Sequence, residues 1–482
     1  MPNVALVVLD TLRKDAFDEH FDWLPGASYD DAWASTHWTV GSHASLFTGL
    51  YASETGVYGT NPRFDYEGET LAESLSTAGY RTRGFTCNPF ITETFDFVRG
   101  FDRMRRNWSS RRLDDDIFDW GDFESEHRFQ GVLRFPEAVL EVLRSDCRTV
   151  PSLKHGLQRK LYFDNSELTD GDKGAKRIAR HLRRMTFDDD EFFFTNLMEA
   201  HGPYRCPPSY QTVTETNDGA SFADVVGFET LRAENTRQAY DDCVRYLASV
   251  YEEIHAELRS SFDYVVTVSD HGESLGEDDN WGHNFGVHPV ITNVPLSVWS
   301  ADGSHESLAT EAAVGLVDVY ATVLGRAGVT HPDGRRGVDL FAATPTTPRL
   351  TEYHGLIRPE IAERIERHAS PDAVDAYDTW LRGLAVADFY AYETVVDATP
   401  QFRERGTLDA NRVPTLGSVI ADADGDGDDG DSGGDGGGGD DAEIDAREVL
   451  EHAHKDLDVR QPGGVAEYTD AVRDELEHLG YL

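Results

Sequence analysis

The stretch NVALVVLDTLRKD at residues 3–15 decides the fold. Its central run VALVVL (4–9) is unbroken and apolar, which is typical of a strand buried on both faces of a parallel sheet. Asp10 follows the last apolar residue, at the point where such a strand ends. In open α/β sheets, ligands bind at the carboxyl ends of the strands. The segment therefore predicts a buried central strand with a functional aspartate directly after it.

Strand and helix patterns alternate along the first 340 residues. Apolar runs predict further strands at 81–86, 191–197, 264–269 and 294–299. Helical spacing predicts a helix within 70–80 and a long amphipathic helix over 232–258. This alternation predicts an α/β fold with a doubly wound, mostly parallel central sheet.

The composition describes an acidic globular chain. Among its 482 residues, 88 are Asp or Glu and 44 are Lys or Arg, which gives a formal net charge of −44. Only 6 of the basic residues are Lys, and the other 38 are Arg. Phosphate contacts need clustered Arg and Lys, so no nucleic acid is expected as a partner. Acidic residues spread along the whole chain favour a halophilic protein, because concentrated salt screens their repulsion.

Cysteine usage and the first residues favour a cytoplasmic protein. The four cysteines form no CxxC motif and no paired spacing, so a disulfide framework is not expected. The chain begins MPNVALVVLD, without the basic and apolar regions of a signal peptide. No apolar run is long enough to span a bilayer, so no transmembrane segment is expected.

Polar side chains follow three of the predicted strands where these strands end: Asp10, then Glu199 and His201, then Asp270 and His271. Each of them alone is as readily a turn or capping residue. Their coincidence at one edge of one sheet points to chemistry. Asp10, Asp270 and His271 would offer two carboxylates and an imidazole to one divalent cation, and this donor set does not choose between Mg, Mn, Ca and Zn.

The stretch HWTVGSHASLFTGL (37–50) places Thr39 at the start of a helical pattern. The Thr39 hydroxyl could complete the coordination of the cation, which would lower its pKa and make it a nucleophile. The backbone N–H groups of the helix start would hold an anionic ester. The alternative is that Thr39 or Ser42 merely caps the helix.

Taken together, these motifs resemble the sulfatase family of the alkaline-phosphatase superfamily. The matching pieces occur in family order over roughly the first 340 residues: NVALVVLDTLRKD, WTVGSHASLFTGLYASETGV, TLAESLSTAGYRTRGF, NLMEAHGPY, TVSDHGESLGE…WGHNFG, NVPLSVW and GLVDVYATVLGRAGV. The resemblance implies an alkaline-phosphatase-like fold, one active-site metal and a nucleophile at the start of the helix after the first crossover. It also implies hydrolysis or transfer of a sulfate or phosphate group.

The chain departs from the family pattern at several positions. The family converts a Cys or Ser at the position of Thr39 into formylglycine, and Thr cannot undergo that conversion, so no formylglycine is expected. Gly41 and His43 stand where the signature has Pro and Arg. Thr11 replaces the second Asp of the first motif, and His283 replaces the Lys of a Gly-Lys pair.

The resemblance and these departures together predict a metal-dependent hydrolase with a Thr39 nucleophile, or a group transferase. Water must cleave a threonyl ester, which favours phosphate over sulfate esters. His201 and His283 are expected to act in catalysis, while His43 and Arg13 would contact the substrate. The expected partner is a small anionic ester, with a glycan or lipid head group as leaving group. The alternative is a degenerate member that binds an anionic glycan or metabolite without turnover.

The remaining polar residues near these motifs are one glutamate and two histidines. Glu199 is expected to orient His201 or to line the wall of the site. His37 and His288 are expected to be structural or surface residues.

The predicted organisation has four parts. A sulfatase-like catalytic domain is expected at 1–345 and a small α+β C-terminal subdomain at 346–420. A disordered acidic Gly/Asp linker is expected at 421–445, followed by a helical segment at 446–482. The alternating stretch 382–396 indicates the antiparallel strands of the subdomain. The linker opens like a calcium loop, but Gly433 stands where such a loop needs a bidentate Glu.

Overall fold

The computed structural model describes residues 1–59, 61–106, 171–188, 190–213, 233–356, 371–396, 398–406 and 445–460, together with positions 142, 149 and 152. The predicted linker, apart from its last residue, lies outside these ranges. So do the chain after residue 460 and most of the unassigned region 100–190.

A seven-stranded mixed sheet forms the centre of the larger part of the molecule, with the strand order β2-β10-β7-β1-β6-β4-β5. The strands are β1 (Val4–Leu9), β2 (Ala27–Tyr29), β4 (Arg81–Thr86), β5 (Arg103–Arg106), β6 (Glu191–Leu197), β7 (Tyr264–Val268) and β10 (Leu296–Ser300). The five strands from β7 to β5 in that order run parallel, whereas β10 is antiparallel to both β7 and β2. The carboxyl ends of the parallel strands therefore meet at one edge.

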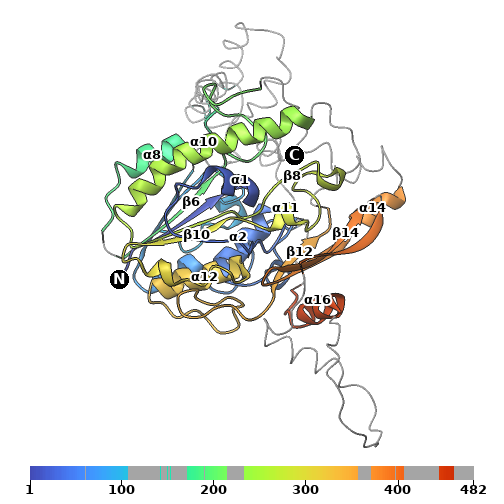
Figure 1. Ribbon diagram of the computed structural model, residues 1–482. Helices are drawn as coiled ribbons and strands as arrows, with labels where there is room; N and C mark the ends of the chain where they lie inside the picture. Colours follow the sequence, from blue (N-terminus) through green and yellow to red (C-terminus); the bar gives the residue numbers. More distant parts are fainter. Residues whose placement is uncertain are drawn as a thin grey trace, which may run out of the picture.

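Helices cover both faces of this sheet (Figure 1). One group comprises α1 (Lys14–His20), α8 (Ala175–Leu182) and α10 (Ala233–Arg259), and the other comprises α2 (Thr39–Thr48), α4 (Leu71–Thr77) and α12 (Leu316–Arg326). Two short helices, α3 (Ala52–Thr55) and α11 (Pro289–Thr292), lie in connections. This is the layering that a doubly wound sheet requires.

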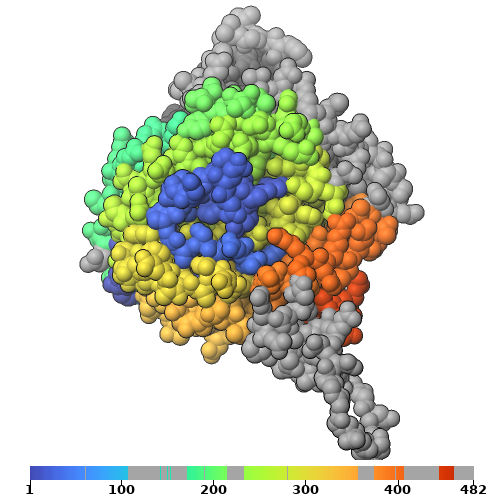
Figure 2. Space-filling model, viewed as in Figure 1, coloured from blue at the N-terminus to red at the C-terminus, as the bar shows by residue number. Residues whose placement is uncertain are grey.

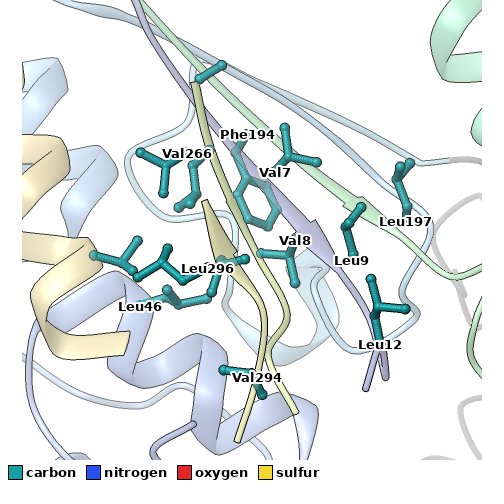
Figure 3. Packing of buried hydrophobic residues seen from close by; sticks show 14 of the residues in the cluster. Val7, Val8, Leu9, Leu12, Leu46, Phe194, Leu197, Val266, Val294 and Leu296 are labelled. Atoms are coloured by element: carbon teal, nitrogen blue, oxygen red, sulfur yellow. The ribbon is translucent and has the colours of Figure 1, made fainter. Parts of the chain in front are cut away.

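The core explains why the sequence of β1 is apolar at every position. All six residues of β1 are fully buried, since helices pack on both of its faces. Figure 3 shows Val8 in one cluster with Leu296 of β10 and Leu46 of α2. Full burial of a Val or Leu side chain contributes roughly 1.5–3 kcal/mol, so this strand anchors the domain.

A four-stranded antiparallel sheet forms the smaller C-terminal part, which lies at one side of the molecule (Figure 2, orange). Its strands follow one another in the order β12 (Arg349–His354), β13 (Trp380–Val386), β14 (Phe389–Val396) and β15 (Thr399–Arg405). The helices α14 (Pro371–Tyr377) and α16 (Ala446–Lys455) accompany it. Two pairs of short strands complete the described structure: β3 (Ala32–Trp33) with β11 (Val314–Gly315), and β8 (Ser274–Leu275) with β9 (Trp281–Gly282).

Strand β12 of the small sheet contacts elements that cover the central sheet: helix α12 and the segment before α2. The Arg349 guanidinium donates Nε–H to Asp318 Oδ2 at 2.6 Å and Nη2–H to Oδ1 at 2.8 Å, and both side chains are buried. The same aspartate, near the start of α12, also accepts the backbone N–H groups of Gly315 and Val338 at 2.8 Å. Further along the same strand, Glu352 N donates to Ser35 O at 2.9 Å, on the segment that leads into α2.

The structure confirms the predicted fold class, with refinements at two places. The strand predicted at 294–299 begins at Leu296, because Pro295 lacks the N–H that a ladder needs. The stretch 382–396 spans two strands, which are joined at Ala387 in a left-handed conformation (φ 49°). In the described part of the chain, no helix combines the length and the apolarity needed to cross a membrane.

Candidate active site

The carboxyl ends of β1 and β7 bring the three predicted metal ligands together. Asp10, Asp270 and His271 are fully buried, and one ligand atom from each lies within 4.8 Å of the others. His271 Nε2 lies 4.0 Å from Asp10 Oδ1 and 3.6 Å from Asp270 Oδ2. The strands are hydrogen-bonded neighbours in the sheet, so the convergence follows directly from the topology.

Thr39 completes this cluster from the other side. Its Oγ1 lies 3.1 Å from His271 Nε2. His271 Nδ1 lies 2.9 Å from the carbonyl oxygen of Gly272, which can only accept, so Nδ1 carries the proton and Nε2 has a lone pair. That lone pair faces the Thr39 hydroxyl and both carboxylates. It is therefore directed at the point where a cation would lie.

The local structure around Thr39 differs from an ordinary cap. Thr39 is the first residue of α2, and Trp38 in extended conformation precedes it without a side-chain capping bond. The Ser42 hydroxyl donates to Thr36 O instead. Neither Thr39 nor Ser42 therefore caps the helix, and the Thr39 hydroxyl instead lies next to His271 Nε2.

The two aspartates have opposite electrostatic settings. Burial acts to raise the pKa of Asp10, but the neighbouring His201 and His271 and the Asn196 amide outweigh burial, so the pKa falls to about 2. Burial, followed by the charge of Asp10, raises the pKa of Asp270 well above its usual range. Two carboxylates so close together repel each other unless a positive charge lies between them.

The residues present fit a divalent cation. Asp270 Oδ1 accepts backbone N–H groups from Thr11 at 3.3 Å and His271 at 3.1 Å, whereas the buried Oδ2 has no hydrogen-bond partner. A buried carboxylate oxygen without a donor is costly. Oδ2 faces His271 Nε2, so a cation held by Asp10, Asp270 and His271 would satisfy it.

His201 and His283 lie next to the cluster. Their ring centroids are 5.2 Å apart, and the His283 ring is 4.4 Å from that of His271. His283 Nδ1 lies 2.9 Å from Glu273 Oε1, while Glu273 Oε2 accepts the Tyr204 hydroxyl at 2.9 Å. His201 Nδ1 lies 2.5 Å from the Gly202 carbonyl oxygen, and Lys173 Nζ donates to the His201 carbonyl oxygen.

His43 lies beneath the cluster and is fully buried. Its Nδ1 lies 2.9 Å from Thr39 O, one helical turn back, and 3.5 Å from Asp270 Oδ2. Phe47 and Phe194 contact its ring edge-on. This placement lets His43 support Thr39 and Asp270, and its predicted substrate contact stays a prediction.

Arg13 is held by the protein itself. Nε–H and Nη2–H donate to the two carboxylate oxygens of Asp15, and Nη1–H donates to Glu273 O at 3.0 Å and Glu277 Oε1 at 2.8 Å. These bonds link the loop after β1 to the loop after β7. They occupy the guanidinium fork, and the predicted substrate contact of Arg13 stays a prediction.

The remaining polar residues, Glu199, His37 and His288, make hydrogen bonds to the backbone around the site. Glu199 Oε1 accepts the backbone N–H of Ala175 at 2.9 Å, at the start of α8. His37 Nδ1 lies 2.7 Å from the His283 carbonyl oxygen. His288 is the N-cap of α11, where its side chain accepts the N–H of Val290. His37 therefore borders the site.

Four residues in and around the site carry no signal used in the sequence-based prediction. Asn88 and Asn196 donate to Asp10, Glu273 contacts His283, and Tyr204 donates to Glu273. Asn88 follows β4, which ends at the same edge as β1, so the strand-end rule could have found it. Asn196 lies inside a strand, where the sequence carries no signal for a function.

Comparisons with known proteins agree with this architecture. The family model described as Sulfatase matches residues 2–329. The uncharacterized sulfatase YidJ of Escherichia coli is 21% identical over 387 residues, which is 73% of this chain and 73% of that protein.

Solved structures show the same fold at low identity. The phosphonate monoester hydrolase of Agrobacterium radiobacter superposes with a TM-score of 0.56 at 17% identity, covering 88% of this chain and 92% of that one. A putative sulfatase from Bacteroides thetaiotaomicron superposes with a TM-score of 0.52 at 12% identity, covering 88% and 90%.

The doubly wound sheet with acidic and histidine side chains at its carboxyl edge defines an alkaline-phosphatase-like α/β protein. The match over most of the chain makes the assignment finer: the chain belongs to the sulfatase family. Ester hydrolysis is the activity that this family supports.

Proposed function

We propose that this protein is a metal-dependent hydrolase that cleaves phosphate esters through a covalent intermediate on Thr39. The observation that carries the proposal is the 3.1 Å distance from Thr39 Oγ1 to His271 Nε2, within the buried cluster formed with Asp10 and Asp270. A hydroxyl used only for packing or capping has no need of a position next to a ligand atom of this cluster.

A divalent cation held by Asp10, Asp270 and His271 would lower the pKa of the Thr39 hydroxyl and neutralise charge on the ester. Membership of the sulfatase family supports the presence of such a cation. In the structure, the buried Asp270 Oδ2 without a hydrogen-bond partner supports it as well. The donor set does not distinguish Ca, Mg, Mn and Zn.

The protein groups divide the remaining tasks. Thr39 lies at the N-terminus of α2, where N–H groups face outward from the helix and favour an anion. His271 directs Nε2 into the cluster, 3.1 Å from the Thr39 hydroxyl, so a cation bound by His271 would lie beside that hydroxyl. His201 and His283 lie side by side and can bind the ester oxygens or protonate the leaving group.

The proposed reaction has two balanced steps. In the first step, the Thr39 hydroxyl loses its proton to solvent and Oγ1 forms a bond to phosphorus, while the bond from phosphorus to the leaving-group oxygen breaks and that oxygen takes a proton from His201 or His283. In the second step, water attacks phosphorus and the bond to Thr39 Oγ1 breaks. One proton of this water passes to Oγ1 and the other restores the proton of the histidine. Phosphate esters suit this route because a threonyl ester is released by attack of water, whereas formylglycine releases sulfate by elimination.

The substrate class remains part of the proposal. Among proteins of the same fold are phosphonate monoester hydrolases from Agrobacterium radiobacter and Silicibacter pomeroyi. They support a phosphorus ester as substrate, with a glycan or lipid head group as leaving group.

The test compares the wild type with Thr39→Val, which keeps the shape of the side chain and removes only the hydroxyl. Both proteins are assayed with nitrophenyl sulfate, phosphate monoester, phosphodiester and phosphonate monoester, in turn with Mg²⁺, Ca²⁺, Mn²⁺ and Zn²⁺. We expect wild-type turnover of a phosphorus ester and a loss of at least about 10³-fold in kcat for Thr39→Val, as for removal of a nucleophile.

Two results would contradict the proposal. Unchanged turnover in Thr39→Val would remove the nucleophile assignment. A wild type that turns over none of the substrates but binds anions would favour the degenerate, binding-only member of the family.

A further inference from the structure

We infer that Asn88 and Asn196 are positioning residues that fix which oxygen of Asp10 faces the cation. The inference rests on the proposed function, since it assigns the pair a task at the proposed metal centre. It concerns affinity for the cation rather than a step of the reaction.

Both amides bind the same carboxylate oxygen. Asn88 Nδ2 donates to Asp10 Oδ2 at 2.7 Å, and Asn196 Nδ2 donates to the same atom at 3.1 Å. The other oxygen, Oδ1, accepts the Thr11 hydroxyl at 2.8 Å and lies 4.0 Å from His271 Nε2. Oδ2 is thus occupied by two N–H donors, and Oδ1 is the oxygen directed at the ligand cluster.

One amide lies in β6 and the other in the loop after β4, so the Asp10 carboxylate is held from two neighbouring parts of the sheet. Asn196 lies in β6, which pairs with β1, and Asn88 follows β4, which pairs with β6. Asp10, Asn88 and Asn196 are all 0% exposed. In this dry setting, water cannot replace a lost amide donor, and the direction of the carboxylate depends on the protein alone.

The orientation of each amide group is determined by its neighbours. Asn88 Oδ1 accepts the backbone N–H of Phe90 at 2.9 Å, so Nδ2 must point at Asp10. Asn196 has no such bond: its buried Oδ1 has no hydrogen-bond partner. A flipped Asn196 amide would direct an oxygen at the Asp10 carboxylate, which is repulsive.

The unpartnered oxygen of Asn196 distinguishes a positioning role from a folding role. A buried polar atom without a partner costs about 1–3 kcal/mol. A strand residue that served stability alone would avoid this cost, as the buried apolar side chains of Phe192, Phe194 and Leu197 in the same strand do. The amide is explained by its bond to Asp10.

The same geometry predicts an effect on metal affinity. Without one amide, the Asp10 carboxylate can rotate and direct either oxygen at the cluster, so the ligand is no longer preorganised. Residues that orient a metal ligand in this way typically affect affinity by 10–100-fold, roughly.

The experiment uses the full chain, stripped with a chelator and titrated by calorimetry with the cation that binds the wild type most tightly among Mg²⁺, Ca²⁺, Mn²⁺ and Zn²⁺. The variants are Asn196→Val and Asn88→Ala. The matched control is Asn3→Ala at the opposite end of β1, where Asn3 Nδ2 donates to Asp188 O and Ser261 O at 2.9 Å. Each protein is titrated well below its melting temperature.

We expect the Kd of Asn196→Val and of Asn88→Ala to rise by about 10–100-fold, while that of Asn3→Ala stays within about twofold of the wild type. A merely structural role would lower the melting temperature of all three variants and leave Kd unchanged, which would overturn the inference. If one variant does not fold, the other still decides. A wild type that binds no cation would overturn the proposed metal centre, and this inference with it.

Discussion

The Thr39 hydroxyl lies 3.1 Å from Nε2 of His271, although 232 positions separate the two residues in the chain. Thr39 begins helix α2 on one face of the central sheet. His271 follows β7, an inner strand of that sheet. The contact exists because both elements reach the carboxyl edge of the sheet. It makes the predicted nucleophile and a predicted metal ligand direct neighbours.

Replacing Asp270 by Asn is expected to have opposite effects with and without metal. In the stripped protein, the change removes one of two buried, repelling carboxylates, so the melting temperature should rise. With metal, it removes a charged ligand, so the metal-induced gain in melting temperature should shrink. Thermal melts in chelator and in excess cation check both signs. A lower melting temperature in chelator would contradict the electrostatic account.

The buried pair of Asp318 and Arg349 should be a large contributor to stability. Arg349→Met leaves Asp318 buried without its charged partner, and we expect a loss of about 3–5 kcal/mol in the free energy of unfolding. Denaturant titration measures it. The control is Arg183→Met, which removes exposed ion pairs with Glu253 and Glu257 and should leave the free energy of unfolding almost unchanged. Similar losses in both variants would refute the prediction.

His255 should make stability fall in acid. Burial, followed by the charge of Arg259, lowers its pKa from 6.5 to about 3. The unfolded chain then binds the proton more tightly than the folded chain, so stability is full above pH 6.5 and declines as the pH falls toward 3. Between pH 7 and 5, the wild type should lose about 2 kcal/mol more than His255→Phe, which keeps the contacts with Trp23 and Tyr251. Equal losses in denaturant titrations would contradict this.

Salt should raise the activity of the enzyme on an anionic ester. The net charge of −44 repels such a substrate, and added salt screens this repulsion. We expect kcat/KM for an anionic ester to increase with KCl concentration while a neutral ester would show little change. A steady fall in kcat/KM as KCl is added would show that local attraction at the site outweighs the field of the whole protein.

The sequence predicted the fold because β1, β6 and β7 are short, apolar and buried on both faces. It predicted the convergence of Asp10, Asp270 and His271 because parallel strands end at one edge. It missed partners whose importance depends on tertiary contacts. Asn196 lies within a strand, and its role is visible only when its amide is seen next to Asp10.

Arg13 illustrates a different limit. A basic residue near a predicted anion site favours a substrate contact, and only the coordinates show that Asp15 and Glu277 already bind its guanidinium.

The bond from Glu352 to Ser35 has an evolutionary consequence. The small sheet is hydrogen-bonded to the segment that leads to Thr39. Recombination between relatives could therefore not exchange this sheet without affecting the position of Thr39. A chimera carrying a foreign C-terminal part would lose this hydrogen bond to the segment before Thr39, the proposed nucleophile. Among relatives, the residues around Glu352 and those around Ser35 should therefore change together, and whole C-terminal parts should rarely be exchanged.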